Sequence, residues 1–165
     1  MKTRFLFTVL FAAFAAFACS KNQPAQSNAA DQANTAATGP RTIEITASDA
    51  MKFNINQIEA APGEEIKVVL TNIGTQPKEV MGHNWVLLKK DVDAAAYDHA
   101  AAQAKAEGYE PKSEADKVIA SIPLLGPKQS AEVTFKAPME KGDYTFLCSF
   151  PAHFQVGMKG TLTVK

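Results

Sequence analysis

The chain has 165 residues, which suffices for one domain with additional segments, and 46% of them are apolar, as in an ordinary globular protein. Its 17 basic residues balance its 17 acidic ones, so there is no basic surplus to attract nucleic acid.

Residues 1–18 are typical of a secretion signal. Lys2 and Arg4 form a positive start, Phe5–Phe17 an apolar segment that is too short to span a membrane, and Ala16-Phe17-Ala18 a small-x-small cleavage site. Removal of this segment leaves 15 basic residues against 17 acidic ones, a net charge of about −2 that is too small to name a partner. We expect a mature protein in the periplasm or cell envelope.

Cys19 follows the cleavage site, as in bacterial lipoproteins, in which the new N-terminal cysteine receives lipid and anchors the protein to a membrane. The alternative is plain secretion with a free Cys19. A lipid on Cys19 would exclude a disulfide with Cys148. Residues 19–41 contain mostly Ala, Asn, Gln, Ser and Thr after this cysteine, and they predict a flexible tether.

Residues 42–165 predict a single domain made of short strands separated by turn signals. Such a pattern favours an all-β sandwich or barrel of about eight antiparallel strands. The expected strands are Thr42–Ala47, Phe53–Ile58, Glu65–Asn72, Val80–Lys89, Val118–Ile122, Ser130–Lys136, Asp143–Cys148 and Met158–Val164.

One inserted α-helix is expected at Ala94–Glu107, where alanine is frequent. Asp93 is placed to cap its first turn, and Gly108 to end it. His99 lies on this helix among polar and alanine positions, so we expect it to face solvent rather than to bind a metal.

A thiol, an imidazole and a thioether follow one another at five-residue intervals near the C-terminus, at Cys148, His153 and Met158. These soft donors select copper, and one Cys with two His and a weak axial Met describes a blue-copper site. The missing imidazole must come from elsewhere. His83 opens a strongly apolar run and is the natural candidate.

Each of these residues also has an ordinary structural interpretation. A lone Cys or Met is most often a core residue, and a lone His a hydrogen-bonded side chain. Zinc is the competing metal, but a zinc site uses further Cys or His in preference to a thioether. The joint spacing on one turn between two strands favours copper.

Several motifs resemble azurin and the auracyanins, blue-copper proteins of the cupredoxin family. The similarity covers most of residues 42–165. The motifs are Met81-Gly82-His83-Asn84-Trp85-Val86-Leu87, Cys148-x-Phe150-Pro151, Met158-Lys159-Gly160-Thr161-Leu162-Thr163, Asp49-x-Met51-x-Phe53-Asn54 and Ser121-x-x-Leu124-Leu125-Gly126.

The resemblance implies a Greek-key cupredoxin fold with a helical flap and one type 1 copper ion that cycles between Cu(I) and Cu(II). It implies that Asn84 locks the ligand loops together and, with the backbone N–H of Phe150, orders the thiolate. The implied metal contacts are three equatorial ligands, a weak axial one and a distant carbonyl oxygen, from His83, Cys148, His153, Met158 and Gly82 respectively.

The sequence departs from azurin in three ways. Four residues, Phe154–Gly157, precede the methionine where azurin has three, a spacing more similar to that of plastocyanin and the auracyanins. Cys148 is the sole cysteine in the domain, so the azurin disulfide has no counterpart. Ala152 and Gln76 stand where azurin has Gly and Leu, which alters the surface that a partner meets.

His153 is the expected exit for the electron, with its ring edge emerging through an apolar patch. The patch would consist of Met51, Met81, Leu124, Pro151, Ala152 and Val156. A small, weakly polar surface suits transient redox encounters. We expect Phe150, Pro151 and Met51 to shield the thiolate.

The expected function is single-electron transport in the periplasm between a donor and an acceptor protein, by a monomer that is not an enzyme. The partners would be a cytochrome c-like protein or a terminal reductase or oxidase. The main rival is a copper carrier or chaperone, which needs an open, exchangeable site. A copper nitrite reductase domain would need a second copper bound by several His, and only His99 remains for it.

Overall fold

The computed structural model describes residues 39–165. The predicted signal peptide, Cys19 and nearly all of the predicted tether lie outside these residues. Strand β1 begins at Arg41, one residue before the expected start of the domain. Within residues 39–165, no helix combines the length and apolar character needed to cross a membrane.

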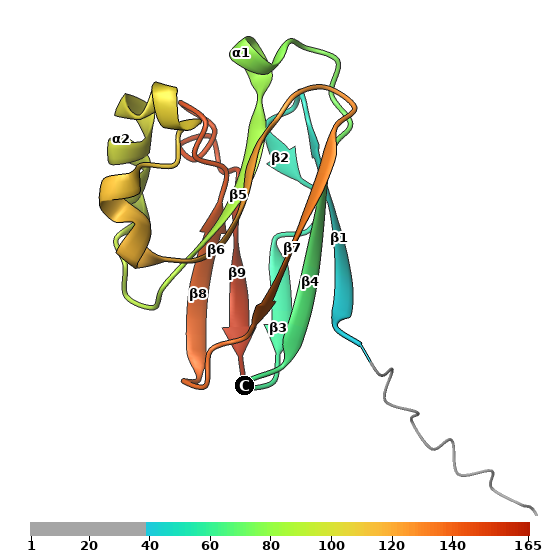
Figure 1. The fold of residues 1–165 in the computed structure, drawn as a ribbon, viewed down its shortest axis with the longest axis vertical. Coiled ribbons are helices and arrows are strands. Elements are labelled where there is room, and N and C mark those ends of the chain that lie inside the picture. Colours follow the sequence, from blue (N-terminus) through green and yellow to red (C-terminus); the bar gives the residue numbers. More distant parts are fainter. Residues whose placement is uncertain (1–38) are drawn as a thin grey trace, which may run out of the picture. The chain divides into compact units, whose positions relative to one another are not determined.

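Two β-sheets pack face to face, and one helical segment covers the outer side of the second sheet (Figure 1). The first sheet has the order β2-β1-β4-β7 and consists of β1 (Arg41–Ser48), β2 (Lys52–Phe53), β4 (Glu65–Asn72) and β7 (Ser130–Lys136). The second has the order β3-β9-β8-β5-β6 and consists of β3 (Gln57–Ala60), β5 (His83–Leu88), β6 (Val118–Leu125), β8 (Gly142–Leu147) and β9 (Lys159–Val164). The predicted all-β sandwich with one inserted α-helix is confirmed.

The expected strand over residues 53–58 is wrong in detail, because the chain changes sheets within it. The β2 strand ends at Phe53 in the first sheet, and β3 begins at Gln57 in the second. Asn54 marks the break, since its side-chain Oδ1 accepts a hydrogen bond from the N–H of Thr46 at 2.7 Å. The described residues therefore form nine strands.

Two strand pairs are parallel, whereas an antiparallel sandwich was expected. The β1 strand pairs with β4, and β3 with β9, in parallel register. The other pairs are antiparallel. The parallel pairs join strands that no hairpin connects, as parallel pairing requires.

The expected strand over residues 80–89 is shorter than predicted. Its beginning belongs to the one-turn helix α1 (Lys78–Met81), in which Pro77 O accepts hydrogen bonds from the N–H groups of Val80 and Met81. Strand β5 then starts at His83 and is buried at every position. Both of its faces are covered, by the sandwich core and by the helical segment, which explains the unbroken apolar run.

Helix α2 (Ala94–Gln103) confirms the predicted insertion and its cap, because the Asp93 carboxylate accepts hydrogen bonds from the N–H groups of Ala95 and Ala96. The helix ends earlier than expected. It continues as two 3-10 turns, η1 (Lys105–Glu107) and η2 (Lys112–Lys117), with Gly108 in the left-handed region at φ 68°. As predicted, His99 is exposed.

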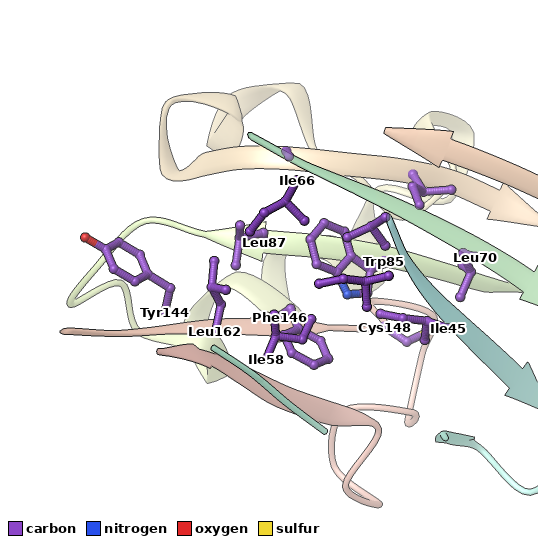
Figure 2. Packing of buried hydrophobic residues seen from close by; sticks show 14 of the residues in the cluster. Ile45, Ile58, Ile66, Leu70, Trp85, Leu87, Tyr144, Phe146, Cys148 and Leu162 are labelled. Carbon is purple, nitrogen blue, oxygen red and sulfur yellow. The ribbon is translucent and has the colours of Figure 1, made fainter. Parts of the chain in front are cut away.

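Side chains from both sheets fill the space between them around Trp85, which is fully buried (Figure 2). Its ring centroid lies 5.7 Å from that of Phe146 and 6.0 Å from that of Phe135. Gly160 leaves room for Phe146, since a Cβ at this position would lie 2.2 Å from the Phe146 ring. The same core continues to Cys148 and Met158 at one end of the sandwich.

Candidate metal centre

Adjacent strands bring the two sequence-distant donors to one end of the second sheet. His83 is the first residue of β5, and Cys148 directly follows β8. Strands β5 and β8 pair antiparallel, with Val86 opposite Leu147, so the start of one lies beside the end of the other. The chain between Cys148 and β9 forms the ligand loop, residues 149–158, which carries the remaining candidates.

Three donor atoms form a compact triangle. The Cys148 Sγ lies 4.0 Å from His83 Nδ1 and 3.4 Å from His153 Nδ1, and all three atoms lie within 4.8 Å of one another. A point equidistant from the corners of a triangle with edges of about 4 Å lies about 2.3 Å from each corner, close to ordinary metal–nitrogen and metal–sulfur bond lengths. The residues present therefore fit one metal ion.

Met158 lies beside this triangle. Its side chain is fully buried in the same core cluster as Cys148. Its N–H donates to His153 O at 2.9 Å, and its carbonyl oxygen accepts from the N–H of Cys148 at 3.1 Å. Two backbone hydrogen bonds thus tie Met158 to Cys148 and His153, and its thioether can complete the soft donor set.

Gly82 directly precedes His83 and is also buried. A Cβ here would lie 2.6 Å from the carbonyl oxygen of Lys78 and 2.9 Å from the side chain of Leu124, so only glycine fits. The predicted contact of the Gly82 carbonyl oxygen with the metal stays a prediction.

The ligand loop is folded by its own backbone. His153 N–H donates to Phe150 O, and Gly157 N–H to Phe154 O. Ala152 adopts φ 72°, in the left-handed region, at the position where azurin was expected to have glycine. The loop thus keeps its tight turn although a methyl group replaces the glycine hydrogen.

Burial keeps the imidazoles neutral. The pKa of His153 falls from 6.5 to about 4, chiefly because burial disfavours the charged ring. Burial also lowers the pKa of His83, against the opposing effect of the Asp49 carboxylate. Both rings therefore keep a free lone pair for a metal at neutral pH.

Burial has the opposite effect on the thiol and raises the pKa of Cys148 to about 12. The backbone N–H groups of Asn84 and Phe150 partly oppose this rise, as expected for groups that order the thiolate. They do not suffice by themselves, so the thiolate needs a bound cation.

A buried hydrogen-bond network joins β5, the ligand loop and the insertion. Asn84 Nδ2 donates to Ser149 Oγ at 2.7 Å, and Ser149 N–H donates to Asn84 Oδ1 at 2.8 Å. Ser149 Oγ in turn donates to Tyr109 O at 2.5 Å. The Tyr109 ring packs edge-on against Phe150, with centroids 5.0 Å apart. The predicted role of Asn84 in locking loops is thus matched by geometry, whereas Ser149 and Tyr109 were missed.

The structure differs from the sequence-based expectation at His153. Its ring was expected to emerge at the surface, but the residue is only 1% exposed. The rings of Phe150 and His83 lie 4.7 and 4.9 Å from it, centroid to centroid, and contribute to its cover. In the expected patch, Ala152 and Val156 are exposed, and Met51, Met81, Leu124 and Pro151 are partly buried.

Comparison with known proteins identifies the chemistry of this centre. The sequence profile of copper-binding proteins of the plastocyanin/azurin family matches residues 41–165. Azurin from Pseudomonas aeruginosa is 36% identical over 128 residues, covering 75% of this chain and 84% of that protein. Auracyanin-B from Chloroflexus aurantiacus is 33% identical over 148 residues. That match covers 87% of this chain but 58% of auracyanin-B, so the chain spans little more than half of that relative.

Solved structures agree in fold. The crystal structure of dithionite-reduced auracyanin from Roseiflexus castenholzii superposes with a TM-score of 0.68 at 35% identity, over 77% of this chain and 99% of that one. Auracyanin A, described as a "blue" copper protein from Chloroflexus aurantiacus, gives a TM-score of 0.66 at 31% identity, over 77% of this chain and 100% of that one. The metal that the donor triangle fits is therefore copper, as predicted.

We expect the metal-free protein to lose stability as the pH falls from about 6.5 to about 4. Unfolding returns His153 to its ordinary pKa of 6.5, so the unfolded chain binds the additional proton in this window. At about 1.4 kcal/mol for each pKa unit, the loss attributable to His153 is at most about 3.5 kcal/mol. Urea unfolding followed by the fluorescence of Trp85, the single tryptophan, measures it.

The matched variants are His153→Gln and, as a control, the exposed His99→Gln. The first should flatten the acid limb of the stability curve, and the second should leave it as in the parent. An unchanged acid limb in His153→Gln would contradict the assignment.

Proposed function

The chain belongs to the plastocyanin/azurin family of copper-binding proteins, and from that premise we propose that it is a single-electron carrier of the bacterial periplasm. The observation that carries this proposal is the triangle formed by Cys148, His83 and His153. Its three soft or intermediate donor atoms are buried in a packed core, at distances from one another that a single metal ion can bridge. The bound copper supplies the redox change between Cu(I) and Cu(II).

The residues around the site suit this task because they resist movement. His83 is held in the strand ladder, and Cys148 is joined to Met158 by a backbone hydrogen bond. Cu(I) and Cu(II) prefer different coordination geometries, so donors that cannot rearrange keep the site acceptable to both states. We propose that His83, Cys148, His153 and Met158 would hold the copper ion, with the carbonyl oxygen of Gly82 as a further, more distant contact.

Electrons would pass through the ligand loop beside His153. Ala152 and Val156 lie close to His153 in the sequence and are exposed, the latter by 52%. A small, weakly polar contact area allows a redox partner to bind and leave quickly. The partners we propose are a donor and an acceptor such as a cytochrome c-like protein and a terminal reductase or oxidase, met by a monomer.

A copper carrier or chaperone is the alternative function, and burial argues against it. The three donors of the triangle are each at most 1% exposed. Exchange of copper with a partner needs ligands that an incoming thiolate or imidazole can reach. A closed site in the core favours retention of the ion and therefore redox cycling.

The N-terminal segment supports a location in the cell envelope. Residues 1–18 have the features of an export signal, and Cys19 stands where a lipoprotein receives its lipid. We propose a lipid anchor at Cys19, with the polar residues after it as a tether that lets the copper domain reach its partners.

Replacing Cys148 by Ser should abolish the intense visible absorption that a thiolate–copper bond produces, since a hydroxyl cannot supply that bond. Absorption spectroscopy and redox titration of the copper-loaded protein test this outcome. The control is His99→Ala, which removes an exposed imidazole and should keep the absorption and a reversible redox couple. A persisting blue band in the Cys148→Ser protein would rule out the electron-carrier site.

Replacing Met158 by Gln should leave copper bound but lower the reduction potential, because an oxygen donor is harder than a thioether and favours Cu(II). Met139→Gln is the matched control, since Met139 is 76% exposed and lies in a loop before β8. Voltammetry compares the three proteins. Equal potentials in all of them would remove Met158 from the ligand set.

Replacing Cys19 by Ala in the full chain should move the protein from the membrane fraction to the soluble periplasmic fraction of the producing bacterium. The physical reason is that the proposed lipid chain on Cys19 would supply the membrane affinity. Cell fractionation followed by immunoblotting measures the distribution. The Ser20→Ala variant serves as a control and should remain with the membrane. Retention of the Cys19→Ala protein there would contradict the anchor.

A further inference from the structure

Much of the ligand loop is exposed to solvent, so packing in the core does not by itself explain what holds the loop in place. Gln155, Val156 and Gly157 are exposed, although the two donors that flank this stretch, His153 and Met158, are buried. His83 begins β5, Cys148 directly follows β8 and Met158 directly precedes β9, so the sheet ladder supports these three donors. The part of the site with the least support from strands is therefore the segment from His153 to Gly157.

That segment is closed by its own backbone. Met158 N–H donates to His153 O at 2.9 Å, and Gly157 N–H donates to Phe154 O at 3.0 Å. These bonds join the two ends of the segment to each other. A contact at any point within it then acts on both donors at its ends.

Helix α2 makes such a contact through a carboxyl group that the copper chemistry does not use. Gln155 Nε2 donates to Asp98 Oδ2 at 2.5 Å, across 57 positions of sequence. Phe154 packs against the cluster formed by α2, β5 and β8, and the Lys159 ammonium lies 4.5 Å from the centre of its ring. The hydrogen bond thus supplements an apolar contact at the neighbouring residue.

Asp98 is unusual as a packing residue. It is 2% exposed, and its second carboxyl oxygen, Oδ1, has no hydrogen-bond partner within the described residues. Burial of a carboxyl group with one unpaired oxygen destabilises the fold. An apolar side chain would suit the interior better if packing were the sole requirement. The buried carboxylate is therefore explained by its hydrogen bond with Gln155.

We propose that Asp98 is a positioning residue for the copper centre: through Gln155 it fixes the segment between His153 and Met158, and with it the two donors at its ends. The inference rests on the proposed copper site and assigns the inserted helix a part in it. The four-residue spacing between His153 and Met158 is part of this interaction, because Gln155 is one of those four residues.

Two substitutions separate the hydrogen bond from the charge. Gln155→Leu removes the donor and leaves the carboxylate in place, whereas Asp98→Asn removes the charge and retains an oxygen that can accept from Gln155. Gln103→Leu is the matched control, because Gln103 is an exposed glutamine on the same helix. Gln155 is itself exposed, so its replacement leaves the core intact.

The experiment uses the copper-loaded protein and measures its visible absorption spectrum and the rate at which a chelator removes Cu(I). In Gln155→Leu we expect altered relative band intensities and about tenfold faster copper release, the usual scale for losing a group that orients a ligand. Asp98→Asn and Gln103→Leu should match the parent in both measurements. The double variant Asp98→Ala/Gln155→Leu should release copper no faster than Gln155→Leu alone.

Two outcomes would overturn the inference. One is a Gln155→Leu protein that is indistinguishable from the Gln103→Leu control. The other is an Asp98→Asn protein changed as much as Gln155→Leu, which would assign the effect to charge instead of to the hydrogen bond. Failure of the proposed function would look different, because the parent protein itself would then lack the blue band and a reversible redox couple.

Discussion

The burial of one thiol is the constraint on which the rest of the site depends. Cys148 is fully enclosed, and because this burial opposes a bare thiolate it raises the pKa of the thiol to about 12. The thiolate is nevertheless the form that binds metal, so deprotonation and copper binding must occur together. The two neutral imidazoles complete an environment that is unfavourable to a proton and favourable to a soft cation. Metal selectivity and retention thus follow from the same enclosure.

The sandwich holds this centre from three directions. The strand ladder fixes His83, the β8 strand leads directly into Cys148, and the insertion contacts the ligand loop at Ser149, Phe150 and Gln155. None of these supports belongs to a separate domain. The metal centre is therefore one end of the hydrophobic core, and the forces that stabilise the fold also limit movement of the ligands.

The donors could be predicted from the sequence because their chemistry and spacing are local. Cys148, His153 and Met158 share one short loop, and the chain offers few other histidines. The contacts that place the loop could not be predicted, since Ser149 meets a carbonyl group 40 positions away and Gln155 a carboxylate 57 positions away. The change of sheet after Phe53 was missed for a related reason. Its run of alternating residues reads as one strand, and only the pairing of Asn54 with Thr46 shows the bend.

The helical insertion connects two strands that are already hydrogen-bonded neighbours, because β5 and β6 pair antiparallel along their length. Its two ends therefore meet side by side, and the sheet places little demand on the length of the excursion between them. A segment attached in this way is exchangeable: it can be shortened, lengthened or recomposed while the strand register, and with it the placement of His83, stays the same. One scaffold could thereby carry differently tuned copper centres whose ligands are identical.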